Sequence, residues 1–305
     1  MTIAHWDDVQ PQRVDEGQLG SERYDLGTAA GSLNVGVKRL VVRSGKLSSP
    51  VHIEGDEEEI FYVLGGSALS WQDGETHEVG PGDCLVHHAS GKPHTMLAGE
   101  AGLDVLAFGE RSFPTTTHLP RAGILRMDVN VQVLEGPTAF QREGKVGDLD
   151  TPPPSPRPNS IVNVDDVEGD ARDGPTVARR RRDLARTAGS VRTGLKVYET
   201  RPGKLATPPH CHSAEEELFV VLDGDGQLLL GDNEHAVRRG HIVARPPGTG
   251  IAHAFRAGEN GLTFLAYGTR EPNDICFYPR SGKVFFRGVN LVARIESLDY
   301  WEGEE

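Results

Sequence analysis

The sequence has few cysteines, few aromatic residues and no long apolar run, and each shortage excludes a class of protein. The three cysteines, Cys84, Cys211 and Cys276, form neither a CxxC pair nor an even-numbered set, which argues against a disulfide framework. No apolar run approaches the roughly 20 residues that a membrane helix needs. Residues 1–12 lack the pattern of a signal peptide. We therefore expect a cytoplasmic protein with no membrane partner.

Basic residues are also scarce relative to acidic ones. The chain has 32 Lys and Arg against 45 Asp and Glu, which gives a net charge of -13. Such a surface repels phosphate backbones, so we predict no nucleic-acid partner. We interpret the one basic run, residues 179–182, as a solvated segment beside the acidic stretch at 165–173.

Glycine and proline, by contrast, are plentiful. The 305 residues include 37 Gly and 20 Pro, and these counts are typical of a chain with many turns between short strands. Residues 60–64 and 218–222 are β-branched and aromatic runs closed by glycine, and long amphipathic helices are absent from the sequence pattern. This pattern predicts an all-β fold of the sandwich or jelly-roll barrel kind.

An internal repeat organises the chain. A shift of 158 positions, which places Gly36 on Gly194, matches the second half of the chain to the first. The identical pairs in the densest window include Lys38 and Lys196, Arg43 and Arg201, Pro50 and Pro208, His52 and His210, and the glutamates at 57–59 and 215–217. A period of this length indicates a duplicated domain. The proline-rich segment 151–158 is the expected join, so we predict one domain over 1–150 and another over 151–305.

The second half carries a set of metal-ligating residue types. His210 and His212 are two positions apart on an expected strand and therefore share a face. Glu217 opens the next strand, and His253 follows a later turn that contains Gly248. Three neutral imidazoles and one carboxylate leave a divalent ion with a net charge of +1 and with open coordination positions. The alternative is that these histidines merely pack inside a barrel, but burying all four without an ion is costly.

These spacings resemble those of the cupin family. The sequence His210-x-His212-x4-Glu217-x6-Gly224 resembles the first cupin motif, and Gly240-x5-Pro246-x-Gly248-x4-His253 resembles the second with two extra residues before the histidine. Ala257 stands where the family has a terminal asparagine that is not a ligand. The resemblance covers both halves and implies two tandem cupin jelly-roll barrels. It also implies a divalent metal, which we expect to be Fe, Mn, Ni or Zn.

The first half departs from this pattern. His52, Glu59 and His94 align with ligand positions, but Glu54 replaces the second histidine and Ala89 replaces the motif proline. These four residues, His52, Glu54, Glu59 and His94, are a candidate second metal site. Two carboxylates would neutralise M²⁺ and weaken its attraction for an anionic substrate. The alternative is a degenerate site kept for packing.

Several other residues receive blander interpretations. We expect Glu57 and Glu58 to be solvated in a turn and His87 and His88 to be ordinary strand histidines, although one of them could lie next to the metal ligands. The repeated Lys38, Lys196, Arg43 and Arg201 are expected to be surface charges rather than inward-facing carboxylate binders. Cys211 should face an apolar layer.

Two function hypotheses follow from the intact second site. The favoured one is an enzyme in which a small, oxygen-rich organic substrate chelates the metal. Dioxygenase-like cleavage is the favoured reaction type, and decarboxylation, isomerisation and lyase chemistry are the alternatives. The alternative is a non-catalytic metal-binding cupin that acts as a ligand sensor or a storage protein. The resemblance is compatible with a homo-oligomer.

Overall fold

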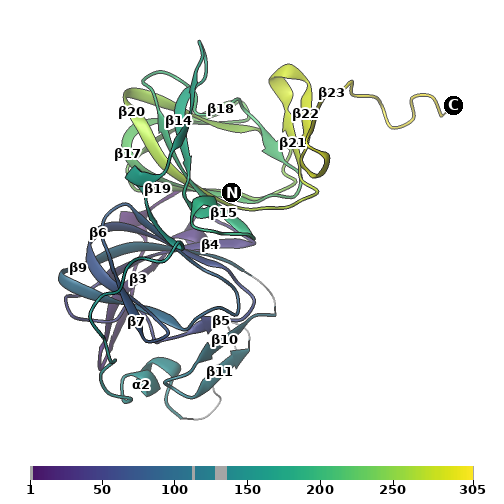
Figure 1. Ribbon diagram of the computed structural model, residues 1–305. Helices are drawn as coiled ribbons and strands as arrows, with labels where there is room; N and C mark the ends of the chain where they lie inside the picture. Colours follow the sequence, from purple (N-terminus) through teal and green to yellow (C-terminus); the bar gives the residue numbers. More distant parts are fainter. Residues whose placement is uncertain (1–2, 112–113, 128–135, 305) are drawn as a thin grey trace.

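The computed structural model describes residues 3–111, 114–127 and 136–304 and forms two β-barrels, one stacked on the other (Figure 1). The predicted all-β fold is confirmed, because strands dominate and the helices are single turns or little more. The first half contains β1 (Ile3–His5), η1 (Trp6–Asp8), β2 (Gln12–Glu16), β3 (Leu19–Asp25), α1 (Leu26–Ala29), β4 (Val35–Val42), β5 (Ile53–Glu54), β6 (Glu59–Gln72), β7 (Glu75–Val79), β8 (Asp83–His87), β9 (His94–Glu110), β10 (Thr116–Leu119), β11 (Ile124–Met127) and α2 (Ala139–Glu143).

The second half repeats this series. It contains β12 (Ile161–Asn163), η2 (Val164–Asp166), β13 (Gly169–Asp173), β14 (Ala178–Asp183), α3 (Leu184–Thr187), β15 (Thr193–Thr200), β16 (Cys211–His212), β17 (Glu217–Leu230), β18 (Asn233–Arg238), β19 (His241–Arg245), β20 (His253–Thr269), β21 (Ile275–Tyr278), η3 (Pro279–Ser281), β22 (Lys283–Phe286), η4 (Arg287–Val289) and β23 (Leu291–Arg294).

Each barrel has one large antiparallel sheet, and the two barrels exchange their first strands. The sheet of the second barrel runs β1-β19-β17-β20-β15-β14-β13, and that of the first runs β12-β8-β6-β9-β4-β3-β2. Ile3 therefore pairs with Val243, while Ile161 pairs with Leu85. The two pairings are equivalent, because the 158-residue shift places Ile3 on Ile161 and Leu85 on Val243. The two halves of the chain therefore make the same strand exchange, as expected for a duplicated domain.

The long strand pairs at the centre of each sheet, β6 with β9 and β17 with β20, bend at Gly66 and Gly224. The pairing of β6 with β9 changes register around Gly66, and that of β17 with β20 changes around Gly224. Both glycines have positive φ, and a Cβ on Gly66 would lie 2.1 Å from the carbonyl oxygen of Gly102. Only glycine allows this close strand approach.

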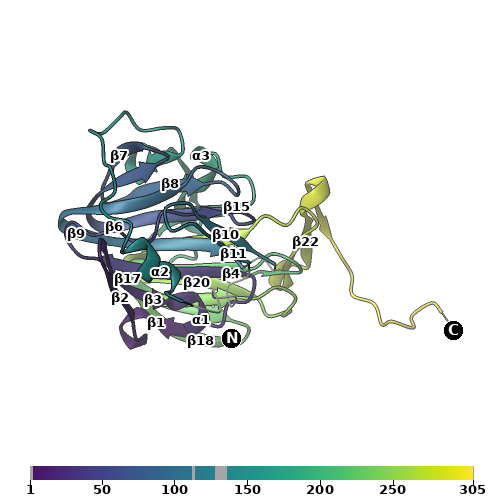
Figure 2. The same ribbon diagram turned by 90° about the horizontal axis from the view of Figure 1, so that it is seen from below.

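A shared apolar core joins the two barrels. One buried cluster contains side chains from both halves, including Leu26, Phe108, Leu184 and Tyr267. The rings of Phe108 and Tyr267 lie 5.1 Å apart, one from each barrel. Viewed from below, one barrel lies in front of the other (Figure 2). The halves are thus packed together rather than tethered.

Glu58 and Glu216 clamp this interface from opposite sides. Glu58 is fully buried, so the prediction that it is solvated is wrong. Its carboxylate accepts hydrogen bonds from the Val191 amide at 3.1 Å and from the Thr193 hydroxyl at 2.8 Å. Glu216 accepts from the amides of Leu33 and Asn34 at 2.7 and 2.6 Å. The repeated glutamates therefore bind each other's domain.

Two smaller sheets close the barrel mouths. The order β11-β10-β5 closes the first barrel, and β16-β21-β22-β23 closes the second. Beyond β23 the chain leaves the body and ends well away from it (Figure 1). No helix among the described residues is long and apolar enough to cross a membrane.

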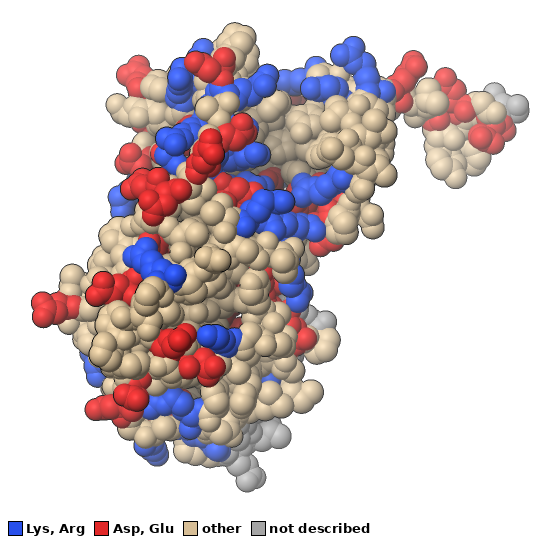
Figure 3. Space-filling view, in the orientation of Figure 1, with Lys and Arg blue, Asp and Glu red and all other residues tan. Residues whose placement is uncertain are grey.

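The expected linker and the basic run both lie against the protein. In the segment 151–158, Ser155 donates its amide to Thr76, and Arg157 makes two hydrogen bonds of 2.8 Å to Asp83. The run 179–182 is not a solvated segment but part of β14, where Arg182 is buried and ion-paired to Glu199 at 2.8 Å. Acidic and basic side chains are interspersed over the face shown in Figure 3. The division of the chain at 150/151 stays a prediction.

Candidate metal centre

The four predicted ligands of the second barrel converge on one point. His210 and His212 flank the start of β16, Glu217 opens β17 and His253 opens β20. His210 and His253 form a backbone bridge, which places their side chains next to each other. The Glu217 Oε2 atom lies 3.3 Å from Nε2 of His212, 3.0 Å from Nε2 of His253 and 3.9 Å from Nε2 of His210.

Buried polar atoms at this point lack hydrogen bonds. His212 Nε2, Glu217 Oε2 and His253 Nε2 are inaccessible to solvent and have no partner of acceptable geometry among the described residues. A buried polar atom without a partner costs about 1–3 kcal/mol, so three together need an explanation. A divalent ion bound at the convergence point would satisfy all three. The donor set therefore fits a metal.

Outer hydrogen bonds orient two of the imidazoles. His210 Nδ1 lies 2.8 Å from the Pro208 carbonyl oxygen, and His212 Nδ1 lies 2.7 Å from Asp274 Oδ2. Each contact puts the ring hydrogen on Nδ1 and leaves the Nε2 lone pair aimed at the site. Burial, together with the neighbouring His253, lowers the pKa of His210 to about 4, which keeps this ring neutral. Neutral imidazole is the form that binds metals.

Asp274 is the most important residue that sequence reasoning missed. Its side chain is buried and also accepts hydrogen bonds from the Ala214 and Glu215 amides at 3.0 and 3.1 Å. Burial opposes its charge, but the contact with His212 and these amides lower its pKa to about 2. Glu217 and Asp274 thus flank His212 with two carboxylates and favour positive charge there. Although burial opposes it, they raise the pKa of His212 to about 11 when no ion is bound, and a bound divalent ion would supply this positive charge in place of the Nε2 proton. The repeat assigned no role to Asp274: beyond one inserted residue the shift is 159 positions, as for His94 and His253, and the partner of Asp274 is Thr115.

Three further residues surround the second site. Cys276 has its sulfur within 4.8 Å of ligand atoms of His210 and His212, and Tyr278 stacks on the His210 ring with centroids 5.8 Å apart. Arg287 binds the Glu215 carboxylate with both terminal nitrogens. Because β21 and β22 are far from the motifs in sequence, no local pattern placed them here. Cys211 is buried and pairs in register with Phe277, and it is not part of the clusters of candidate ligand atoms.

In the first barrel, His52, Glu59 and His94 form a corresponding cluster. Glu59 Oε2 lies 3.1 Å from His52 Nε2 and 3.0 Å from His94 Nε2, both with hydrogen-bond geometry. His52 Nδ1 contacts the Pro50 carbonyl oxygen, as His210 Nδ1 does that of Pro208. His94 Nδ1 contacts the Lys92 carbonyl oxygen, whereas His253 Nδ1 has no partner among the described residues. Here the donor atoms are satisfied by one another.

Glu54, the fourth candidate, lies outside this cluster. Its carboxylate accepts a hydrogen bond of 2.8 Å from the Thr117 hydroxyl. Burial and the nearby Glu59 raise the pKa of Glu54. Glu54 pairs with Thr117 across the strands just as His212 pairs with Cys276, so both members of the pair differ between the barrels.

His87 lies directly behind the first cluster. It is buried, and its ring is parallel to that of His94 with centroids 3.7 Å apart. Burial and His94 hold the pKa of His87 well below its usual range. The corresponding position in the second barrel is Arg245, which is buried and donates to the Ile251 carbonyl at 2.7 Å. His87 is therefore a neighbour of the ligands rather than an isolated strand residue.

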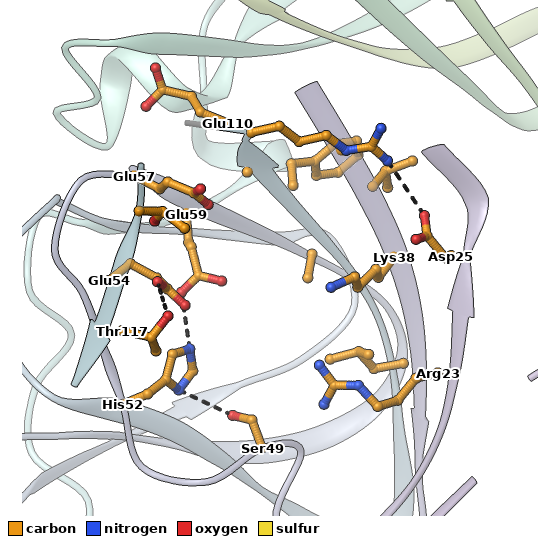
Figure 4. Close-up of a pocket in the computed structure, with 18 of the residues that line it drawn as sticks. Arg23, Asp25, Lys38, Ser49, His52, Glu54, Glu57, Glu59, Glu110 and Thr117 are labelled. Atoms are coloured by element: carbon orange, nitrogen blue, oxygen red, sulfur yellow. Dashed lines mark hydrogen bonds and ion pairs between the residues drawn. The ribbon is translucent and has the colours of Figure 1, made fainter. Parts of the chain in front are cut away.

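A cavity of about 540 Å³ opens in front of the first cluster. Figure 4 shows His52, Glu54 and Glu59 on one wall and Arg23 and Lys38 projecting from the other. Lys38 is exposed, as predicted, but its side chain projects into this cavity rather than outward, because its strand β4 lines the barrel. Arg43 and Arg201 are exposed as predicted and pair with Asp15 and Asp173.

Comparisons with known proteins agree with this architecture. The Cupin domain family matches residues 38–107 and 196–266. The structure of oxalate decarboxylase from Bacillus subtilis at pH 4.6 is similar with a TM-score of 0.59 and 15% identity, over 88% of this chain and 75% of that one. The formate complex of the Lactobacillus farciminis oxalate decarboxylase is similar with a TM-score of 0.59 and 15% identity, over 88% and 86%. No curated protein sequence matches this chain.

The duplicated strand order, the two clusters at matching positions and the two matched segments agree with one another. This chain is a bicupin of the cupin superfamily, with two cupin barrels in tandem.

Proposed function

We propose that this protein is a metal-dependent enzyme that cleaves a carbon–carbon bond in a small, oxygen-rich organic acid, with its chemistry in the second barrel. The observation that carries the proposal is the convergence of buried atoms without hydrogen bonds on His212, Glu217 and His253. A divalent ion held there by these residues and His210 would supply Lewis-acid or dioxygen-activating chemistry. Dioxygenase-like cleavage and decarboxylation both break such a bond, and decarboxylation is the activity in the names of similar structures.

The chain's own residues contribute orientation and charge. Asp274 fixes His212, and the buried Arg245 adds positive charge near His253. Tyr278 covers His210 and narrows the access to that side of the site. With three imidazoles and one carboxylate as ligands, a bound ion keeps a positive charge that attracts a carboxylate substrate. The three cysteines are buried and not disulfide-bonded, which suits the proposed cytoplasmic location.

Turnover measurements test the proposal and separate its two reactions. The protein, loaded separately with Fe(II) and Mn(II), is incubated with oxalate, other short hydroxy- and keto-acids, catechols and diketones. Dioxygen uptake indicates oxidative cleavage, and carbon dioxide release without dioxygen uptake indicates decarboxylation. If the metal-loaded protein converts none of these substrates, the non-catalytic metal-binding alternative is favoured.

A further inference from the structure

The cavity of the first barrel has an electrostatic asymmetry that the metal candidates leave unexplained. One wall carries the acidic side chains of Glu54, Glu57 and Glu59 together with His52, and the opposite wall carries Arg23 and Lys38 (Figure 4). Arg126, on the sheet that closes the mouth, also lines the cavity. Two cations thus face the interior of the barrel from adjacent strands, β3 and β4.

Neither of these two cations is neutralised by the protein. Among the residues that the structure describes, the Lys38 side chain has no hydrogen bond or ion pair and is exposed to the solvent of the cavity. The half-buried Arg23 guanidinium donates to the Ser48 carbonyl at 3.2 Å and lies over the Phe140 ring, and no carboxylate pairs with it. Arg39, by contrast, pairs with Asp104 at 2.7 Å. Burial lowers the pKa of both Arg23 and Lys38, and Arg23 lowers that of Lys38 further. An anion between them would relieve this unfavourable arrangement.

The repeat shows that this arrangement belongs to the first barrel. Arg23 corresponds to Arg181, which lies 3.3 Å from Asp170 on the neighbouring strand. The residue opposite Arg23 is the neutral Gln12. The second barrel therefore supplies a carboxylate to its arginine, and the first barrel leaves that place to a ligand.

We propose that the cavity of the first barrel is a binding site for a small organic dianion, one of whose carboxylates lies between Arg23 and Lys38. The rest of the ligand extends toward Arg126, a third cation that lines the cavity and can attract the second carboxylate. The volume of about 540 Å³ is in the usual range of ligand pockets. The site does not depend on catalysis in the second barrel and goes beyond the proposed function.

Isothermal titration calorimetry on the intact protein tests the site. Succinate, glutarate and citrate are titrated separately at low ionic strength, and neutral succinamide is the control. At least one of the three anions should bind with one site per chain, and succinamide should not. Lys38→Met and Arg23→Gln should each weaken binding by about tenfold or more, because each removes a charge-assisted contact. The matched variant Lys196→Met should leave the affinity within about twofold.

Three outcomes overturn the proposal. They are no binding of any of the three anions, unchanged binding in both Lys38→Met and Arg23→Gln, and loss of binding in Lys196→Met with retention in Lys38→Met. Thermal melting confirms that each variant is folded, and Lys38→Met alone decides if Arg23→Gln does not fold. The double variant His210→Ala/His212→Ala separates the two proposals: it should abolish turnover and keep anion binding. A protein that binds the anion but has no turnover refutes only the proposed function.

Discussion

The two barrels share a backbone plan but differ in what their interiors collect. In the second, His212, Asp274 and Cys276 stand where the first has Glu54, Thr115 and Thr117. The second interior therefore gathers donors around a point where buried atoms lack hydrogen bonds. The first satisfies its donors internally and directs two cations into a cavity. Duplication preserved the scaffold, and a few interior positions separated the two chemistries.

The largest expected difference between the barrels is in turnover. Glu217→Gln or His253→Ala should lower any activity more than about 100-fold, beyond the loss expected from an outer hydrogen bond. His52→Ala and Glu59→Gln should leave most of it. Steady-state kinetics on each folded variant provides the measurement. Activity lost with His52 and retained without His253 would reverse the assignment.

The outer carboxylate should matter next. Asp274→Asn removes the carboxylate charge, and with its oxygen held by the Ala214 and Glu215 amides it presents an NH2 donor to His212 Nδ1 in place of an acceptor. We therefore expect metal affinity in the second barrel to fall about 10–100-fold. The matched variant Thr115→Val in the first barrel should leave this affinity unchanged. Metal content measured against a competing chelator compares the two. Equal affinities in Asp274→Asn and the wild type would contradict the proposed role of Asp274.

Metal removal should destabilise the fold through the second barrel. An ion present at 100 times its dissociation constant stabilises the native state by about 2.7 kcal/mol, and a chelator removes this contribution. Thermal unfolding should therefore show a lower midpoint with chelator in the wild type and in His52→Ala. In His210→Ala/His212→Ala the chelator should have no effect. A midpoint that does not change in the wild type after confirmed metal removal would show that the site is weak.

The smallest effect concerns the interface glutamates. Glu58→Ala leaves the buried Ser190 and Thr193 hydroxyls and the Val191 amide without their acceptor, a loss of about 1–3 kcal/mol of unfolding free energy. Glu216→Ala frees only the amides of Leu33 and Asn34 and should cost less. Chemical denaturation of both variants measures the difference. A larger loss of unfolding free energy in Glu216→Ala than in Glu58→Ala would show that the number of hydrogen bonds does not set the contribution of each glutamate.

The repeat and the motif spacings were enough to predict the barrels and the clustering of the histidine and glutamate side chains, whose role as metal ligands stays a prediction. Strand alternation put His210 and His212 on one face, and the motif position of Gly224 coincides with the bend of the β17/β20 pair. The same spacing placed His52, Glu59 and His94 together. These are local features, and their physical cause lies within short segments or in the duplication.

The partners of those residues could not be predicted, because they come from distant segments. Asp274 reaches His212 only after β21 pairs with β16, and Glu58 is buried only because the other barrel covers it. For Lys38 the sequence pattern allowed either direction, and the closure of the barrel decided that it faces inward.

The sequence by itself determined an all-β duplicated chain with metal-ligating residue types at matching positions, because strand periodicity and turn chemistry act over a few residues. Only the tertiary structure decided which polar atoms lie buried without hydrogen bonds, which cations face a cavity and how the barrels exchange β1 and β12. Burial and charge pairing depend on segments that meet only in the folded molecule, so no local pattern carries them.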